Sequence, residues 1–184
     1  MGDVRSVLVP KNRRSPLKQH WKAIVEILTK QLKLMVCLRT QSGRWAVLMR
    51  VSPETTDPQH LQKGVDFVSA FVAGFSVQDA LAILRIDGIY MESFHINDVR
   101  QRLRNDHMAR AVGRICGANG RIRLSIENAT RTRIVMADRC IRILGSNERI
   151  AVARKAICDL IIGAPPNKVF GRLQNQIARL DSTF

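Results

Sequence analysis

The chain has 184 residues, of which 30 are Lys or Arg and 15 are Asp or Glu, so its formal net charge is +15 and its isoelectric point is near 11. Apolar residues make up 46% of the chain, which is too many for a disordered basic tail. No apolar run approaches the roughly 18 residues of a membrane-spanning helix, and the first residues lack the apolar core of a signal peptide. These properties predict a folded intracellular protein of one or two domains that has no membrane partner.

Arginine supplies most of the positive charge, at 22 of the 30 basic residues. Its planar guanidinium pairs with phosphate and stacks on bases. Membrane binding would instead need an amphipathic helix with one basic face, and no such pattern is found. Nucleic acid is therefore the leading class of partner. Aromatic residues, at 5%, are too few for a sheet that stacks bases on aromatic rings.

The four cysteines and four histidines are widely separated and form no CxxC pair or other metal-binding spacing. This separation argues against a zinc site. We expect free, mostly buried thiols in a reducing compartment. The sequence predicts no metal, no cofactor and no small-molecule substrate.

The first half of the chain alternates between short apolar strands and amphipathic helices. Periodicity predicts a strand over 4–9, a helix from Ser15-Pro16 to about residue 32, strands over 34–38 and 45–51, a helix from Asp57-Pro58 to about residue 72, and a helix over 76–84. Ser15 precedes a proline at the first helical position, and Ser76 and Asp79 form a capping box. The turn over 41–43 makes the two middle strands a hairpin.

The second half begins at the Asp87-Gly88 turn and repeats this order with a glycine loop added. The predicted elements are a strand over 89–96, a helix capped by Asn105 or Asp106 and reaching residue 115, a loop over 117–120, a short helix carrying Ile122 and Ile126, strands over 132–136 and 140–144, and a last helix over 150–161. A tight turn is expected near 137–139, and the last helix is expected to stop at Gly163 before two prolines.

The same order of strands and helices occurs in both halves of the chain. This repeat predicts an α+β fold with two packed domains, over 1–86 and 87–184. Each domain would hold a three-stranded antiparallel sheet with helices on one face. The first domain has no glycine between Asp3 and Ser42, so it cannot form a glycine loop at the corresponding position. The first copy is therefore expected to be degenerate.

The tetrapeptide Gly117-Ala118-Asn119-Gly120 interrupts two helical segments and is followed by two strands and a helix. This order is the type I K-homology (KH) pattern, in which a GXXG loop clamps single-stranded nucleic-acid backbone. Because glycines lack a Cβ, the chain can turn sharply and phosphates can approach the N–H groups of the next helix. The segment 100–133 adds nine Arg against two acidic residues.

The predicted RNA-binding site combines this loop with the arginines and isoleucines around it. The loop backbone would hold phosphates, while nearby arginines supply charge. Isoleucines at 115, 122 and 134 would form an apolar floor for unstacked bases, and Arg131 and Arg133 could read base edges. The candidate residues are Arg110, Gly113, Arg114, Ile115, Gly117, Ala118, Asn119, Gly120, Arg121, Ile122, Arg123, Arg131, Arg133 and Ile134.

Other interpretations of this segment remain open. Helix, glycine turn and helix also describe a helix-turn-helix DNA-binding protein, although the two strands that follow disfavour it. The loop could also be a plain interhelical turn beside solvated arginines. Catalysis is not expected, because Asp98 and Asp106 are not clustered as two-metal nucleases require. Glu127 lies in the most basic stretch, where it would pair with Arg131 or cap the turn.

Longer motifs give a more specific resemblance. They are Gly113-Arg-Ile-Cys-Gly-Ala-Asn-Gly120, Ile126-Glu-Asn-Ala-Thr-Arg-Thr-Arg-Ile-Val135, Ile143-Leu-Gly145, Gly163-Ala-Pro-Pro-Asn-Lys-Val-Phe-Gly171, Phe75-Ser-Val-Gln-Asp-Ala-Leu-Ala82 and Glu92-Ser-Phe94. Over nearly its whole length the chain resembles the partner-of-Nob family, the KH-domain pre-rRNA-processing factors that partner the PIN-domain endonuclease of small-subunit maturation. In place of the usual Lys of that family's loop, the chain has Ala118-Asn119.

The resemblance implies two KH domains, the first degenerate and the second binding pre-18S rRNA near its 3′ end. It further implies association with the endonuclease and with pre-40S particle proteins, and a place in the nucleus and nucleolus with passage to the cytoplasm. The chain would then be a non-catalytic RNA-binding ribosome biogenesis factor. The alternative from another class is a protein-interaction scaffold that docks the endonuclease and binds RNA incidentally.

Overall fold

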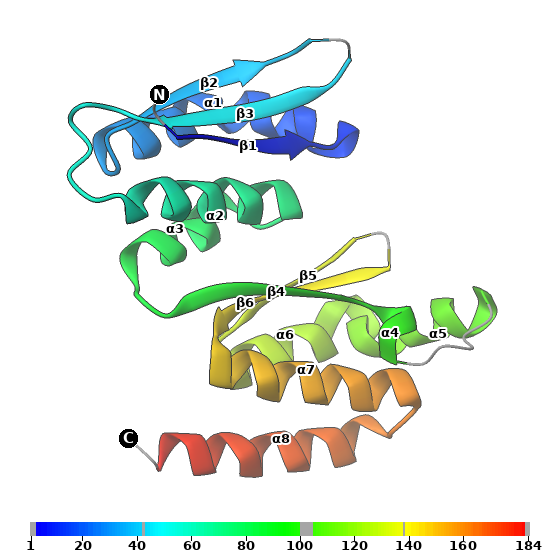
Figure 1. The fold of residues 1–184 in the computed structure, drawn as a ribbon. Helices are drawn as coiled ribbons and strands as arrows, with labels where there is room; N and C mark the ends of the chain where they lie inside the picture. The colour runs from blue at the N-terminus through cyan, green and yellow to red at the C-terminus, as the bar shows by residue number, and fades with distance from the viewer. Residues whose placement is uncertain (1–2, 42, 100–104, 138, 183–184) are drawn as a thin grey trace. The chain divides into compact units, whose positions relative to one another are not determined.

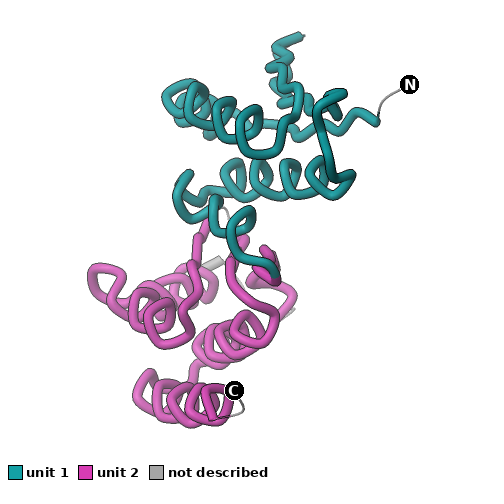
Figure 2. The backbone as a smooth tube through the Cα atoms, turned by 90° about the vertical axis from the view of Figure 1, so that its left-hand side faces the viewer, with its two compact units in different colours: residues 1–87 teal, residues 88–184 magenta. Residues whose placement is uncertain are grey.

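A computed structural model describes residues 3–41, 43–99, 105–137 and 139–182 of the chain (Figure 1). The chain divides into two units, Met1–Asp87 and Gly88–Phe184 (Figure 2). Each unit is built around its own three-stranded sheet. The predicted boundary falls one residue earlier. Some expectations fall on residues outside the described ranges, namely Ser42, Arg100, Arg102, Arg104 and Asp138.

The first unit forms an antiparallel sheet in the order β1-β3-β2, with helices on one face (Figure 1). Its elements are β1 (Val4–Val9), a 3-10 turn (Lys11–Arg13), α1 (Arg14–Lys30), β2 (Leu34–Arg39), β3 (Trp45–Val51), α2 (Gln59–Ala73) and α3 (Val77–Arg85). Three residues of 3-10 helix connect β1 to α1, where the second unit has helices and a glycine loop. The first copy therefore has the sheet and helices of the pattern without its loop.

Alternation along these strands separates a core face from an outer face. Leu34, Val47 and Met49 are buried, and their strands contact α1 and α2. Trp45 is only partly buried. The cationic groups of Arg14 and Lys18 lie over its ring, at 5.4 and 5.1 Å from the ring centre.

Helix starts in this unit follow the predicted signals with one shift. Ser76 caps α3, since its Oγ accepts a hydrogen bond from the backbone N–H of Asp79 at 3.0 Å. Asp57 accepts in the same way from the N–H of Gln59 at 2.8 Å. The first helix, α1, begins at Arg14 rather than after Ser15, because the preceding 3-10 turn already has helical geometry.

The second unit has the equivalent antiparallel order, β4-β6-β5, and again places its helices on one face (Figure 1). Its elements are β4 (Ile89–His95), α4 (Ile96–Val99), α5 (Asn105–Cys116), a 3-10 turn (Ala118–Gly120), α6 (Arg121–Thr130), β5 (Arg133–Ala137), β6 (Cys140–Ser146), α7 (Asn147–Ile162) and α8 (Pro166–Asp181). Buried isoleucines from the helices and from β5 and β6 form one continuous core. This fold confirms the α+β prediction and the predicted sheets.

One helix lies beyond the predicted elements. The helix α7 ends at Gly163 as expected, but Pro165 and Pro166 then begin α8. A proline in the first helical turn loses no hydrogen bond, because the N–H groups there have no partner within the helix. Val169 and Leu173 are buried at four-residue spacing and pack α8 against α7.

No helix in the described part of the chain has the length and apolar character that crossing a membrane requires. Within the same ranges, the structure contains no group of three or more His, Cys, Asp or Glu side chains that could hold a metal ion.

Candidate nucleic-acid interface

The glycine loop forms a sharp turn between two helices of the second unit. After α5 ends at Cys116, Gly117 (φ +67°, ψ −177°) leads into the 3-10 turn. Asn119 and Gly120 are also left-handed, with φ of +53° and +75°. Within this turn the N–H groups of Gly120 and Arg121 donate to the carbonyl oxygens of Gly117 and Ala118, and α6 begins directly after it.

The turn depends on Gly117 through both backbone angle and space. A Cβ on Gly117 would lie 2.6 Å from Cγ1 of Ile122, well inside normal contact distance. Gly120 shares the left-handed φ, but the nearest atom to its Cβ position, Nη2 of Arg123, is 4.0 Å away. Gly113 lies within α5 and has nothing within 4 Å of its Cβ position. The loop therefore requires glycine at 117 far more than α5 requires it at 113.

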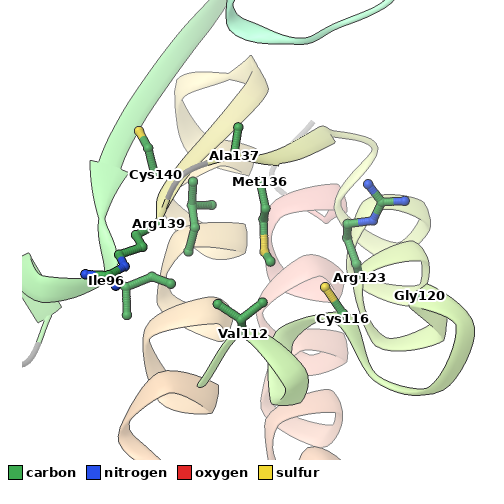
Figure 3. A pocket seen from close by; sticks show the side chains of 10 residues that line it. Ile96, Val112, Cys116, Gly120, Arg123, Met136, Ala137, Arg139 and Cys140 are labelled. Atoms are coloured by element: carbon green, nitrogen blue, oxygen red, sulfur yellow. The ribbon is translucent and has the colours of Figure 1, made fainter. Parts of the chain in front are cut away.

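A pocket with a volume of about 390 Å³ opens beside the loop (Figure 3). Figure 3 shows Met136 and Val112 pointing toward one another across it, with Arg123 on one side and Arg139 on the other. The pocket is lined by Ile96, Val112, Cys116, Gly120, Arg123, Met136, Ala137, Arg139, Cys140 and Ile141. It thus combines an apolar floor with two guanidinium groups and the last glycine of the loop.

The strand β5 presents one edge to this pocket. The N–H of Ile134 donates to Oε1 of Glu127 at 2.6 Å, and its carbonyl oxygen accepts from Nη1 of Arg123 at 3.2 Å. Both main-chain groups of Ile134 therefore point away from β6. The two-residue repeat of a strand gives the N–H and C=O of Met136 the same orientation, so they lie along the edge that borders the pocket.

Residues 93–178, which contain this loop and pocket, match the family model of the second PNO1 KH domain, a eukaryotic type KH-domain (KH-domain type I). The chain is 48% identical to the RNA-binding protein pno1 of Drosophila melanogaster, over 97% of this chain and 73% of that protein. The chain belongs to the PNO1 family. It is likewise 48% identical to the pre-rRNA-processing protein pno1 of Aspergillus oryzae, over 99% of this chain and 69% of that protein.

Solved structures share the fold of this PNO1-family chain. A chain in the crystal structure of the a/eIF2alpha-aDim2p-rRNA complex from Pyrococcus horikoshii has a TM-score of 0.81 at 27% identity, covering 97% of this chain and 96% of that one. A protein of unknown function from Aeropyrum pernix has a TM-score of 0.86 at 22% identity, covering 100% of this chain and 95% of that one, and shows the fold alone. The predicted family and the type I KH fold are confirmed.

The structure brings together part of the site predicted for this PNO1-family chain. Gly120 and Arg123 line the pocket. Ala118, Asn119 and Arg121 are exposed at the loop beside it. With Gly117, these residues lie along one stretch of chain from the loop into the first turn of α6.

The three isoleucines predicted as the floor lie deeper than expected. Ile115 and Ile134 are 0% and 1% exposed and belong to the core, so they support the pocket from beneath. Ile122 is partly buried against that core and lies next to Gly117. The prediction that bases rest on Ile115 and Ile134 was wrong, because both side chains are buried in the core of the second unit.

Besides Arg121 at the loop, four of the predicted arginines do not line the pocket. Arg110 and Arg114 are exposed on α5, and Nη1 of Arg114 lies beside Gly163 at the end of α7. Arg131 follows α6, at the opposite end of that helix from the loop. Arg133 lies on the face of β5 opposite to the side chain of Met136. Arg131 and Arg133 are therefore wrongly placed to read base edges in this pocket.

Most of the apolar lining of the pocket, and one of its arginines, were not predicted from the sequence. Val112 and Met136 lie on apolar faces of predicted elements, and periodicity does not distinguish a core position from a pocket position. Arg139, with a left-handed φ of +68°, was part of the expected tight turn near 137–139. Arg139 lies in the turn between β5 and β6. This position at the end of a predicted strand near the loop was the signal that could have identified Arg139.

The cysteines of this PNO1-family chain differ from the expectation of mostly buried thiols. Cys140 is buried, Cys116 and Cys158 are partly buried, and Cys37 is exposed. Burial raises the pKa of the Cys158 thiol. Cys116 and Cys140 lie in the pocket lining, where the sequence analysis did not place them.

The carboxylates considered for catalysis have main-chain partners. Asp98 accepts a hydrogen bond from the N–H of His95 at 3.0 Å, as expected of a cap. Glu127, 6% exposed, accepts a hydrogen bond from the N–H of Ile134 on β5 instead of pairing with Arg131 or capping the turn as predicted. The prediction was wrong because its side chain reaches from α6 to the neighbouring strand. The side chain of Asp106 lies outside the described residues.

Proposed function

We propose that this chain is a non-catalytic RNA-binding factor of small-subunit ribosome biogenesis that holds pre-18S rRNA near its 3′ end. The observation that carries the proposal is the pocket at which the GXXG loop, two guanidinium groups and the edge of β5 meet. Family membership supports it, because curated relatives are named RNA-binding and pre-rRNA-processing proteins. Main-chain hydrogen bonds to Asp98 and Glu127 favour structural roles for these carboxylates.

In the proposed contact, the backbone holds phosphates and the pocket holds a base. The left-handed loop and the N-terminus of α6 supply N–H donors. Arg121 and Arg123 supply the charge that a loop lysine supplies elsewhere in the family. An unstacked base would lie between Val112 and Met136 and form hydrogen bonds along the edge of β5.

Replacing Ala118 and Asn119 together by Asp tests this contact. Two carboxylates at the loop should repel phosphate and weaken the binding of a single-stranded oligonucleotide of the 18S rRNA 3′ end by at least about tenfold at near-physiological salt. The measurement is fluorescence anisotropy of the labelled oligonucleotide across a salt series. Both side chains are exposed, so the fold should be retained.

The matched control changes the net charge equally at a distance from the loop. Gln59→Glu with Gln78→Glu places two exposed carboxylates in the first turns of α2 and α3, where acidic side chains are tolerated. We expect this variant to bind within about twofold of the unchanged chain. Equal losses in the two variants would mean that only net charge matters, and the assignment of the pocket would fail.

The proposal includes association with a PIN-domain endonuclease and with pre-40S particle proteins. Its support is the family resemblance carried by the long motifs of the second unit. Co-purification of the tagged chain with the endonuclease, followed by sedimentation with precursor small subunits, tests it. Recovery of the chain only in free fractions, without the endonuclease, would contradict it.

A second candidate function is a scaffold that docks the endonuclease and binds RNA incidentally. It is favoured by the first unit, in which a 3-10 turn replaces the helix and glycine loop. The acidic loop variant separates the two functions. If 18S rRNA maturation in cells survives the loss of RNA affinity, the scaffold is the main function.

The proposed place of action is the nucleus and nucleolus, with passage to the cytoplasm on pre-40S particles. A role in pre-rRNA processing, as named for the curated relatives, supports the nuclear part. Imaging the tagged chain while nuclear export is blocked tests the passage. We expect nuclear accumulation, and an unchanged cytoplasmic pool would contradict it.

A further inference from the structure

Alternate residues of the first unit's strands point to the sheet face opposite the helices. We call this the outer face. Across the sheet its residues align in three rows, which are Val4-Arg50-Met35, Ser6-Leu48-Cys37 and Leu8-Ala46-Arg39. The intervening residues, such as Val47 and Met49, form the core.

The outer face exposes aliphatic side chains in adjacent rows. Leu8, Val4 and Met35 are 69%, 54% and 51% exposed, and they are three of the seven large hydrophobic residues exposed in the described ranges. Two shallow depressions, with volumes of about 500 and 240 Å³, share Leu48 in their linings. Grouped apolar exposure of this kind marks interaction surfaces, whereas single exposed residues do not.

The charged residues that line the two depressions are all arginines. Arg39 and Arg44 line the larger depression, and Arg50 lines the smaller one. The Nε of Arg39 donates to Oε1 of Gln41 at 2.8 Å, which holds the guanidinium at the rim. The sequences of β1, β2 and β3 contain no Asp or Glu. An aliphatic centre is therefore bordered by guanidinium groups on strands without acidic residues.

We propose that the outer face docks an acidic amphipathic segment of a partner protein. Its aliphatic residues would bury apolar side chains of the segment, while the arginines pair with Asp or Glu at the segment's edges. Two guanidinium-bordered faces of a chain with net charge +15 would repel one another, which disfavours a second copy. The rows contain no aromatic residue on which a base could stack, which disfavours single-stranded RNA. This surface does not depend on the proposed RNA pocket.

Photo-crosslinking in cells tests what occupies the face. A photoreactive amino acid replaces Leu8 or Met35 in the full chain, and replaces Ile162, which is 57% exposed on α7, as the control. Mass spectrometry then identifies the crosslinked segment. We expect the photoreactive residue to crosslink a protein segment with interspersed apolar and acidic residues when it replaces Leu8 or Met35. When it replaces Ile162, we expect no such crosslink. Crosslinks to RNA, to a second copy or to a non-acidic segment, or none above the control, would overturn the proposal.

A synthetic peptide of the crosslinked segment gives the quantitative test. Leu8→Glu and Arg44→Glu in the purified full chain should each weaken peptide binding by at least about tenfold, because central apolar anchors and arginines dominate such interfaces. The same changes at exposed positions elsewhere, Ile162→Glu and Arg85→Glu, should change it by less than about twofold. Equal peptide affinity in the Leu8 and Ile162 variants would overturn the proposal. Loss of affinity for the 18S oligonucleotide in the Leu8 variant would also overturn it.

Discussion

Gly117 and Gly113 lie four residues apart, but only Gly117 has no room for a side chain. Gly117→Ala should lower the free energy of unfolding by about 1–3 kcal/mol, because it combines a left-handed φ with overlap on Ile122. RNA affinity should fall as well, since the loop must move. Urea unfolding and oligonucleotide anisotropy measure the two effects.

Gly113→Ala is the matched control for this prediction. Its Cβ meets open space inside a helix, so the free energy of unfolding should rise by up to about 1 kcal/mol. A Gly117→Ala protein as stable as Gly113→Ala would contradict the strained turn that we assign to the loop.

Glu127 is a buried acceptor for a main-chain N–H, and its removal leaves that N–H without this partner. Glu127→Ala should therefore lower the free energy of unfolding by about 1–3 kcal/mol. Glu127→Gln retains an oxygen acceptor at the same position and should lose less. If urea denaturation gives equal stabilities for the Ala and Gln variants, the hydrogen bond to Ile134 contributes nothing.

At the scale of elements, sequence patterns predicted the order of the strands and major helices of both units, with α8 as the exception. Alternating apolar residues specify which face of a strand is buried, and Ser76 and Gly163 mark helix ends through specific backbone hydrogen bonding. The missed helix begins at Pro165-Pro166, because proline ends some helices and begins others. Only the contacts of Val169 and Leu173 with the core distinguish the two cases.

The candidate site was predicted less completely than the fold. Glycine spacing located the loop, since backbone geometry restricts those positions to few residues. Side chains of the pocket depend on how α5, α6 and β5 converge. Their convergence buries Ile115 and leaves Val112 at the surface of the pocket, although both lie on the apolar face of one helix.

The helix α8 should contribute to the stability of the second unit. Leu173 is 1% exposed in the core, so Leu173→Ala should cost about 2–5 kcal/mol of unfolding free energy. Gln174→Ala, at the next and exposed position, should change it by less than about 0.5 kcal/mol. Thermal and urea unfolding of the two variants measure the difference, and equal midpoints would contradict a stabilising role for α8.

At the scale of the whole molecule, positive charge is spread almost evenly, with +7 over residues 1–86 and +8 over residues 87–184. Charge alone therefore attracts any polyanion to both units, and this attraction weakens steeply with salt. In the proposed contact, the pocket would add interactions that need an unstacked base. Specificity should consequently increase relative to total affinity as the salt concentration rises.

A competition assay tests whether the pocket adds specificity to the non-specific attraction of the charge. At near-physiological salt, unlabelled single-stranded 18S 3′-end RNA should displace the labelled oligonucleotide at a concentration at least about tenfold lower than duplex DNA of equal charge. At low salt the concentrations at which the two competitors displace the labelled oligonucleotide should become similar. Stronger competition by duplex DNA would instead favour the helix-turn-helix interpretation.

The hydrogen bonds at Ile134 also limit what can bind along β5. An extended peptide that adds a strand to a sheet must pair with main-chain groups at successive outward-facing residues of the edge. Glu127 and Arg123 already engage both groups of Ile134, which leaves Met136 as the next outward-facing residue. One residue is enough for the edge of a single base and too short for a β-strand. In the proposed RNA contact, this edge would therefore favour a nucleotide over a peptide, because it leaves so short a length of main chain accessible.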